Sequence, residues 1–171
     1  MTDFSVFLEA LEEDAFEEKP VDIEEFVTSN NYLALPPLSD YQYQMIKAST
    51  QIYKHETLIK LYGEVEGEKR WKQTCNEVIF QLGKGSGKDY TSTIACAYVV
   101  YLLLCLKDPA RYYGKPPGDA IDIINVAINA VQAQQVFFKG FKNRITRCPW
   151  FAGKYNEKVG SIEFIKSITV H

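Results

Sequence analysis

The sequence predicts an α/β domain in which a parallel β-sheet is flanked by helices, preceded by an N-terminal helical segment. Three apolar segments predict strands: "NEVIFQL" at 76–82, "AIDIINVAI" at 120–128 and "GSIEFIKSITV", which holds one or two short strands, at 160–170. Helical patterns lie between them, and strands that alternate with helices form parallel sheets through right-handed crossovers. The length of 171 residues and the 46% hydrophobic content suit a single sizeable core. We expect 39–171 to form the main domain and 1–38 to form an acidic helical segment with a connector.

The N-terminal segment concentrates the acidic residues. Residues 1–31 hold ten carboxylates against one lysine, a charge of −9, so the rest of the chain carries +6 although the net charge is −3. Helices are predicted over 3–18 and 21–30, separated at Pro20, because apolar residues recur there at helical spacing. A basic body with an acidic head is typical of a protein that handles polyanions. The head itself fits either a solvated helix surface or a docking site for a partner.

Three longer helices are predicted after the connector "LALPPLSDYQ". The first runs from Tyr41 to about Tyr62, and Ser39 or Asp40 can cap it. The second covers 88–106, and its apolar run of 13 residues is too short for a bilayer, which takes about 20. The third covers 129–147 and is amphipathic. Its apolar face comprises Val131, Val136, Phe137, Phe141 and Ile145. Between the last two helices, "DPARYYGKPPGD" is predicted to be a surface loop.

The cysteines predict reduced thiols. Cys75, Cys96, Cys105 and Cys148 form no C-x-x-C pair, and no histidine stands at metal-ligand spacing from them. A zinc site is therefore not expected. The sequence also has no basic segment followed by an apolar stretch of the signal-peptide kind, so we expect no membrane association.

The segment "QLGKGSGKDY", residues 81–90, joins a predicted strand to the long apolar helix. A phosphate-binding loop needs glycines that let backbone N–H groups converge on the anion, a helix N-terminus that favours negative charge, and a lysine that reaches the outer phosphates. All three are present, with Lys88 as the phosphate lysine. The loop residues before it are Gly83, Lys84, Gly85, Ser86 and Gly87. The sequence therefore predicts a nucleotide-binding loop, and a glycine turn without a ligand is the alternative.

Two residues of this loop depart from the usual G-x-x-x-x-G-K-[ST] pattern. Leu82 stands where the first glycine is expected, and Asp89 stands where a hydroxyl normally ligates Mg²⁺. An aspartate is also a hard oxygen ligand, so it can bind the metal directly or through water. Its negative charge is close to the phosphates, and we therefore expect weaker nucleotide affinity or stronger dependence on Mg²⁺.

The order of four segments carries a resemblance to a known family. "LSDYQYQMI", "VIFQLGKGSGKD", "IDIINVAINAVQAQQVFFKGFKNRI" and "SIEFIKSITVH" together resemble the N-terminal ATPase region of tailed-bacteriophage terminase large subunits, the motors that package DNA into procapsids. The resemblance covers roughly 21–171. It implies a P-loop NTPase fold of the ASCE type that binds ATP and Mg²⁺, with Lys88 in the catalytic role and Asp89 at the metal. Terminases continue with a strand ending in Asp-Glu and then a nuclease domain, so the resemblance implies that this ATPase domain is partial.

The resemblance implies further site residues. In that family a glutamine upstream of the core contacts adenine, and Gln42 in "DYQ" matches best, with Gln44 second. A helix-surface glutamine is the alternative for both. Lys84 takes the place of an arginine proposed to couple nucleotide state to motion, and it keeps the charge without the guanidinium fork.

The helix after the second predicted strand has two possible roles. Asn129 would lie near its start as a cap, and Gln132 could contact neighbouring loops or DNA. Four basic residues follow along it, namely Lys139, Lys142, Arg144 and Arg147. They form a face that could meet DNA phosphates, or else a solvated helix surface.

The resemblance implies a packaging ATPase whose activity belongs to a larger protein. Its partners would be double-stranded DNA, the portal protein and the small terminase subunit, with copies arranged in a ring on the procapsid. It would reside in the host cytoplasm and transiently at the portal vertex. Hydrolysis needs a positioned water as well as phosphate clamping, and neither Asp122, at a strand start, nor Glu163, in a short strand, is a convincing base. We expect this chain alone to bind nucleotide without efficient hydrolysis.

Two other functions are alternatives. The "GSGKD" segment also resembles the loop of some nucleoside monophosphate kinases, although those enzymes place the loop near the N-terminus and carry an arginine-rich lid. In a non-catalytic reading, the chain is an assembly module that docks a portal or small terminase subunit, and the loop is vestigial.

Overall fold

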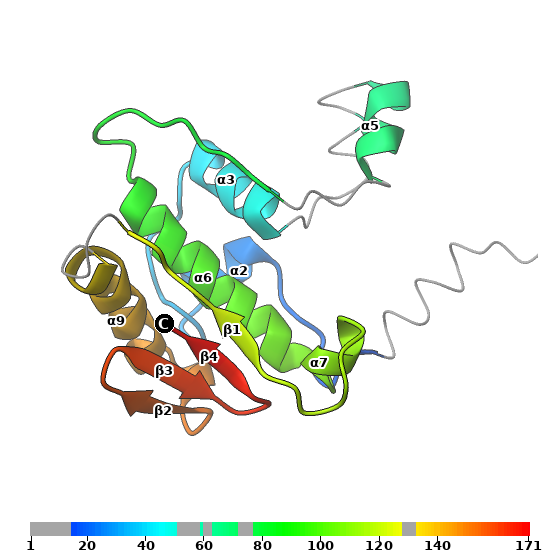
Figure 1. The fold of residues 1–171 in the computed structure, drawn as a ribbon. Coiled ribbons are helices and arrows are strands. Elements are labelled where there is room, and N and C mark those ends of the chain that lie inside the picture. Colours follow the sequence, from blue (N-terminus) through cyan, green and yellow to red (C-terminus); the bar gives the residue numbers. More distant parts are fainter. Residues whose placement is uncertain (1–14, 51–58, 60–62, 72–76, 128–132) are drawn as a thin grey trace, which may run out of the picture.

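The computed structural model describes residues 15–50, 59, 63–71, 77–127 and 133–171 (Figure 1). This part of the chain contains both helices and strands, and the predicted α/β fold with a sheet flanked by helices is confirmed. In chain order the elements are α2 (Ile23–Thr28), α3 (Asp40–Thr50), α5 (Glu64–Trp71), α6 (Lys88–Cys105), α7 (Pro109–Tyr112), β1 (Ile121–Ile123), η1 (Ala133–Phe138), α9 (Lys139–Arg147), η2 (Pro149–Phe151), β2 (Tyr155–Lys158), β3 (Ser161–Phe164) and β4 (Ile168–Val170).

The sheet has four strands in the order β1-β4-β3-β2. β1 and β4 pair in parallel, with Ile121 opposite Ile168 and Ile123 opposite Val170. The β2–β3 and β3–β4 pairs are antiparallel, so the sheet is mixed and the expected parallel pairing holds only for β1 and β4. A crossover of more than 40 residues joins the parallel pair, whereas short turns join the other strands, and such turns permit only antiparallel neighbours.

The strand predicted before the glycine loop is absent. Residues 77–82 are extended but belong to no strand, and Val78, Ile79 and Phe80 are exposed. The apolar run satisfies the side-chain requirement of a buried strand, but in the described part of the chain no neighbouring strand supplies the backbone partners that a strand needs. The strand predicted over 120–128 is confirmed only at Ile121–Ile123, and Ile124 and Val126 beyond it are exposed.

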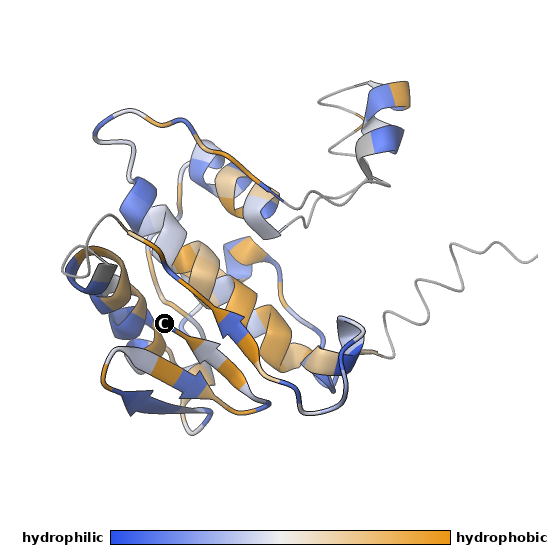
Figure 2. Cartoon of the chain, in the orientation of Figure 1, coloured by the Kyte–Doolittle hydropathy of each residue, from blue (hydrophilic) through white to orange (hydrophobic). Residues whose placement is uncertain are grey.

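Helix α6 lies at the centre of the molecule, with α2 and α3 on one side and α9 on the other (Figure 1). Apolar residues follow one another along most of this helix (Figure 2), as is typical of a helix covered on several sides, and most of them are buried. Tyr101 is fully buried, stacks on Phe26 at 4.8 Å between ring centroids, and accepts a hydrogen bond from the Val21 N–H at 2.8 Å. This contact joins the N-terminal segment to the core.

The other predicted helices are confirmed with different bounds. α2 lies within the predicted 21–30, and Asp22 caps it by accepting from the Glu25 N–H. α3 confirms the helix predicted from Tyr41 as far as Thr50, and the rest of that helix lies almost entirely outside the described residues. The predicted surface loop 108–119 holds the short helix α7.

The helix predicted over 129–147 begins, in the described residues, with the π-helical turn η1 and continues as α9. Phe141 and Ile145 are fully buried and Phe137 is partly buried, which confirms that part of the predicted apolar face. Val136 is exposed, so its assignment to this face is wrong. Val131, Asn129 and Gln132 lie outside the described residues.

The C-terminal segment forms two strands, β3 and β4, and the sequence missed β2. Only Tyr155 of β2 is partly buried, so the strand lacks the apolar alternation that would predict it. It pairs with β3 through the turn at Gly160, whose φ of +81° favours glycine. The turn between β3 and β4 places Lys166 and Ser167 in the same left-handed region, at φ of +59° and +57°.

The N-terminal segment packs along the end of α6 instead of continuing as a helix. Ala15 is helical, but Phe16 forms an antiparallel bridge with Leu106, and the Glu17 N–H donates to Cys105 O at 2.8 Å. The prediction that the first helix reaches residue 18 is therefore wrong, and its residues 3–14 lie outside the described part. Backbone pairing with α6 takes the place of the last helical turn.

Two side-chain contacts hold this acidic segment. Lys166 Nζ donates to Glu17 Oε2 at 2.7 Å and to the carbonyl oxygens of Leu104 and Leu106 at the end of α6. Trp150 Nε1 donates to the Glu18 carboxylate at 3.0 Å, and Lys154 Nζ lies 3.2 Å from the centroid of the same indole ring. The end of the acidic segment is thus bound within the molecule.

Cys96, Cys105 and Cys148 are buried free thiols, as predicted, and Cys75 lies outside the described residues. Burial raises the pKa of the Cys96 thiol to about 12, which keeps it protonated and unreactive. None of the helices in the described ranges has the length and apolar character needed to cross a bilayer.

Candidate functional site

The glycine loop ends at the N-terminus of α6, as the sequence predicts. Lys84 and Gly85 form a turn, and Gly87 caps the helix in the left-handed region, at φ +74° and ψ +20°. The helix ladder begins with the Thr91 N–H, which donates to Gly87 O at 2.9 Å. Because the cap is a glycine, it has no side chain to accept from the other first-turn N–H groups. These groups and the helix dipole together favour an anion at this end.

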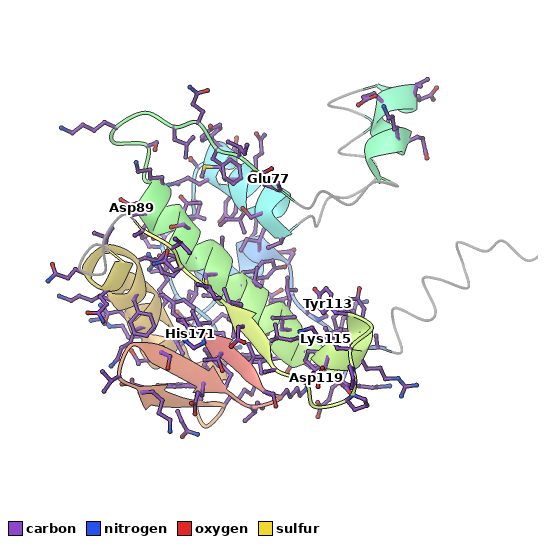
Figure 3. All side chains as sticks on the ribbon, in the orientation of Figure 1. Glu77, Asp89, Tyr113, Lys115, Asp119 and His171 are labelled. Carbon is purple, nitrogen blue, oxygen red and sulfur yellow. The ribbon has the colours of Figure 1, made fainter. Side chains whose placement is uncertain are left out.

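Lys88 is the first residue of α6 and is exposed, together with Lys84 in the loop and Asp89 in the first turn. Figure 3 shows Asp89 at this end of α6. Two lysines and one carboxylate therefore surround the open N–H groups. The arrangement suits a phosphate chain, whose charge the lysines offset.

Gln42 lies beside the loop, although 45 residues separate it from Gly87. A Cβ atom added to Gly87 would lie 2.9 Å from Gln42 Nε2, so the end of the Gln42 side chain would have to move for a larger residue. Gln42 Oε1 accepts from the Ser39 N–H at 3.0 Å and from the Ser39 hydroxyl at 3.1 Å. The Gln42 N–H donates in return to Ser39 Oγ at 3.4 Å. This capping box selects Ser39 over Asp40 as the cap of α3 and turns the amide nitrogen of Gln42 toward the loop.

Two hydroxyl groups near the loop have unused hydrogen-bonding capacity. Ser86 Oγ and Thr91 Oγ1 are buried without a partner among the described residues. Buried polar groups are usually paired, so an unpaired hydroxyl in a phosphate loop is a ready contact for a ligand oxygen. Ser86 directly precedes the Gly87 cap and is the better placed of the two.

The four basic residues of α9 have different surroundings. Lys139 and Arg147 are exposed, and Lys142 pairs with Glu157 of β2 at 2.5 Å. Arg144 instead lies against α6, where its Nε donates to Thr93 Oγ1 at 2.8 Å. The interpretation as a solvated helix face is therefore wrong for Arg144, which packs on α6, and contact of this face with DNA stays a prediction. The sequence contains a signal for this contact, because Gly140 stands one helical turn before Arg144 and lets α9 approach closely.

The carboxylates set aside as hydrolytic bases lie in the sheet. Asp122 of β1 is 3.2 Å from His171 Nε2, and Glu163 of β3 pairs with Lys158 at 3.6 Å. In Figure 3, His171 is well separated from Asp89. Among the residues with described positions, no group of three or more His, Cys, Asp or Glu side chains could hold a metal ion. A cation at the loop would therefore depend on Asp89 together with ligand oxygens.

The comparison with protein families decides the class of this site. A family model described as the N-terminal P-loop domain of the uncharacterized protein MJ0330 matches residues 2–171. The chain belongs to this family. Membership in the MJ0330 P-loop family makes this a P-loop domain, a class that nucleotide binding fits, and the assignment of the loop to Gly83–Lys88 stays a prediction. The predicted P-loop domain is thus confirmed, and the terminase assignment stays a prediction.

One curated relative matches part of the chain. It is the protein MJ0330 of Methanocaldococcus jannaschii, which is 39% identical over 70 residues. The matched stretch is 41% of this chain and 12% of MJ0330, so the chain matches a small part of the relative's length. No solved structure matches the chain.

Proposed function

We propose that this domain binds ATP with Mg²⁺ at the loop from Gly83 to Lys88 and forms the nucleotide-binding part of a DNA-translocating motor of the terminase type. The observation that carries the proposal is the left-handed Gly87 cap, which opens the N-terminus of a buried 18-residue helix next to Lys88. Membership in a P-loop family supports the same use of the loop. The terminase assignment rests on the order of the four sequence segments.

Each loop residue has a role in this proposal. The first-turn N–H groups of α6 and the Gly85 N–H donate to phosphate oxygens, and Lys88 neutralises the outer phosphates. The Ser86 hydroxyl supplies a further hydrogen bond. Gln42 holds Gly87 in place, and its amide nitrogen remains available for the nucleotide.

Asp89 suits a magnesium ion that is held mainly by the nucleotide. Mg²⁺ is commonly bound through one or two carboxylates, substrate phosphates and several waters. Asp89 is exposed in the first turn of α6 and offers one such carboxylate beside the loop. The bound ion would neutralise charge on the phosphates, and Asp89 would orient it directly or through water.

Translocation and its partners belong to the wider proposal. Double-stranded DNA, a portal protein and a small terminase subunit would be the partners of the whole motor, assembled as a ring in the host cytoplasm and at the portal vertex. Asp122 and Glu163, the two carboxylates considered as bases for water, pair with His171 and Lys158 in the sheet, so we propose that this chain binds ATP without efficient hydrolysis.

Calorimetric titration of Mg·ATP and a non-hydrolysable analogue, with a phosphate-release assay, tests the proposal. Lys88→Ala should weaken binding roughly tenfold to a hundredfold, because a hydrogen bond to a charged group is lost. Lys139→Ala is the matched control, since Lys139 is an exposed lysine of α9 outside the loop. Wild-type chain that binds no nucleotide would contradict the proposal.

The same assays separate the alternatives. Phosphoryl transfer from ATP to a nucleoside monophosphate would favour a kinase. Binding of a portal or small terminase subunit by a chain without ATP affinity would favour an assembly module. Rapid phosphate release by the isolated chain would contradict the expected need for a further catalytic segment.

A further inference from the structure

Arg144 is the one basic residue of α9 that the structure places across the beginning of α6. Its Nε donates to Thr93 Oγ1 at 2.8 Å, and its Nη2 donates to the Tyr90 carbonyl at 3.4 Å. Its guanidinium carbon lies 4.5 Å from the centroid of the Tyr90 ring. Tyr90 follows Lys88 by two residues, so Arg144 holds the turn that carries the candidate phosphate-binding N–H groups.

The helix contact around Arg144 is close on both sides. Thr93 is almost fully buried, and its hydroxyl also donates to Tyr90 O at 2.8 Å. Gly140, one turn before Arg144, faces Thr93, and an added Cβ there would lie 3.3 Å from Thr93 Cγ2. A larger residue at 140 would push α9 outward and lengthen the bonds of Arg144. Gly140, Thr93 and Arg144 therefore act together as a clamp between α9 and α6.

The charge of Arg144 is not balanced locally. Among the described residues, no carboxylate forms an ion pair with it. Its guanidinium is half-buried, and desolvation lowers the pKa of the group, although an arginine remains charged at neutral pH. A half-buried cation without a carboxylate adds positive potential to a helix end that already favours anions.

We propose that Arg144 is a positioning residue of the phosphate loop: it fixes the first two turns of α6 from α9, and its charge favours a phosphate at that helix end. The inference rests on the proposed nucleotide binding and deepens it. Gln42 contacts the loop from α3, and Arg144 holds the helix that follows from α9. The phosphate site is thus held from both sides by residues that need not touch the ligand.

Two measurements on four variants test this role. Arg144→Gln removes both the positive charge and the forked guanidinium group, whereas Arg144→Lys keeps the charge. Thr93→Val removes the hydroxyl group but keeps the shape of the side chain. Arg147→Gln is the matched control, because it removes the same charge from an exposed position on α9. Affinity for Mg·ATP is measured well below each melting temperature, and hydrogen exchange of the amides at 91–94, the first ones that donate within α6, is measured without nucleotide.

We expect Arg144→Gln and Thr93→Val each to weaken Mg·ATP binding about tenfold and to speed exchange at 91–94, while Arg147→Gln changes neither by more than about twofold. Arg144→Lys should weaken Mg·ATP binding about threefold, because lysine keeps the charge but lacks the forked guanidinium group. The double variant of Arg144→Gln and Thr93→Val should lose no more Mg·ATP affinity than either single variant, because both substitutions break the same contact.

Exchange at 91–94 decides the positioning role separately from the function. Wild-type exchange rates in Arg144→Gln would overturn the inference whether or not ATP binds. If exchange accelerates but wild-type chain binds no ATP, the loop is positioned by Arg144 and the proposed function is wrong. If Arg144→Gln does not fold, Arg144→Lys and Thr93→Val carry the same test.

Discussion

Gly87 has two constraints at a single residue. Its φ of +74° lies where residues with a Cβ are strained, and Gln42 Nε2 occupies the space that a side chain would need. Neither constraint involves a ligand. The glycine is therefore required for the fold of the loop as well as for phosphate access.

Gly87→Ala should lower the free energy of unfolding by about 2 kcal/mol, since the left-handed conformation costs an L-residue roughly 1–2 kcal/mol and Gln42 must also move. Urea denaturation measures this change. Gly83→Ala is the matched control, because Gly83 has no positive φ and nothing within 4 Å of an added Cβ. An unchanged stability of Gly87→Ala would contradict the geometry of the cap.

Asp89 places a negative charge at a helix end that otherwise attracts anions. Asp89→Ser should raise affinity for ATP without Mg²⁺ about tenfold, since a unit charge at about 10 Å is worth roughly 1.5 kcal/mol at an effective dielectric of about 20. The same substitution should also reduce the difference between the ATP affinities measured with and without Mg²⁺. Titrations of ATP at several Mg²⁺ concentrations measure both effects.

Asp119→Ser is the control for this change, because Asp119 is an exposed aspartate near the far end of α6 (Figure 3). It removes the same charge at a distance where salt screens it. An Asp89→Ser variant that responds to Mg²⁺ like the wild type would rule out a role for Asp89 at the metal.

At the scale of elements, α6 is fixed at both ends by side chains from distant parts of the chain. Gln42 and Arg144 act at its N-terminal end, and Lys166 donates to the carbonyl oxygens of Leu104 and Leu106 at its C-terminal end. The last carbonyl groups of a helix have no partner within it, and a cation there also interacts favourably with the dipole.

Lys166→Met should lower the free energy of unfolding by about 1–3 kcal/mol, because it leaves these carbonyl oxygens without their charged donor. Lys158→Met is the matched control, since Lys158 is exposed and makes only a 3.6 Å pair with Glu163. Chemical denaturation compares the two. An equal decrease in the free energy of unfolding for both variants would show that Lys166 acts only as a surface charge.

The Lys166 contact also predicts a pH dependence. Its hydrogen bond and charge lower the pKa of the Glu17 carboxyl below the ordinary value of 4.5. A depressed pKa in the folded state means that the contribution to stability is complete above about pH 4.5 and is lost as the pH falls through the folded-state value. Melting temperatures of wild type and Glu17→Gln should therefore converge on acidification. A constant difference down to pH 3 would contradict the ion pair.

The whole molecule exposes apolar side chains in two extended segments. Ile79 before the loop is 81% exposed and Val126 after β1 is 84% exposed. Exposed apolar segments with free backbone groups promote association. We expect the chain to self-associate with rising concentration in sedimentation velocity.

The variant with both Ile79→Lys and Val126→Lys should remain monomeric, with stability changed by no more than about 0.5 kcal/mol per site, as for other exposed positions. Val159→Lys is the matched control, because Val159 is an exposed valine in the turn between β2 and β3. Loss of stability in the double variant would show that these residues are buried in solution.

The parts of the fold that the sequence predicts well are those determined by local side-chain patterns. The apolar character of α6, the glycine cap and the buried Phe141 and Ile145 of α9 follow from composition and spacing. The segment 77–82 was wrongly assigned because its pairing depends on other strands, which its own pattern does not specify. β2 was missed for the opposite reason, since its neighbour β3 creates it despite its polar residues.

In the candidate site, too, local sequence patterns predict some residues and only tertiary contacts reveal the others. The loop residues from Gly83 to Asp89 follow from the motif, whereas the contact of Gln42 with Gly87 was expected only as an adenine contact. Arg144 looked like one of four similar basic residues, and only the packing of α9 on α6 distinguishes it. Tertiary contacts of long polar side chains leave little trace in sequence.

The contact between Trp150 and Glu18 gives this protein an internal optical reporter. The indole N–H donates to a carboxylate of the N-terminal segment, and the Lys154 ammonium lies over the ring. Both charges shift and quench indole emission, so release of the segment from α6 would change the colour and intensity of Trp150 fluorescence. With only two tryptophans in the chain, replacing Trp71 by phenylalanine would leave one fluorophore that follows this docking in real time without an added label.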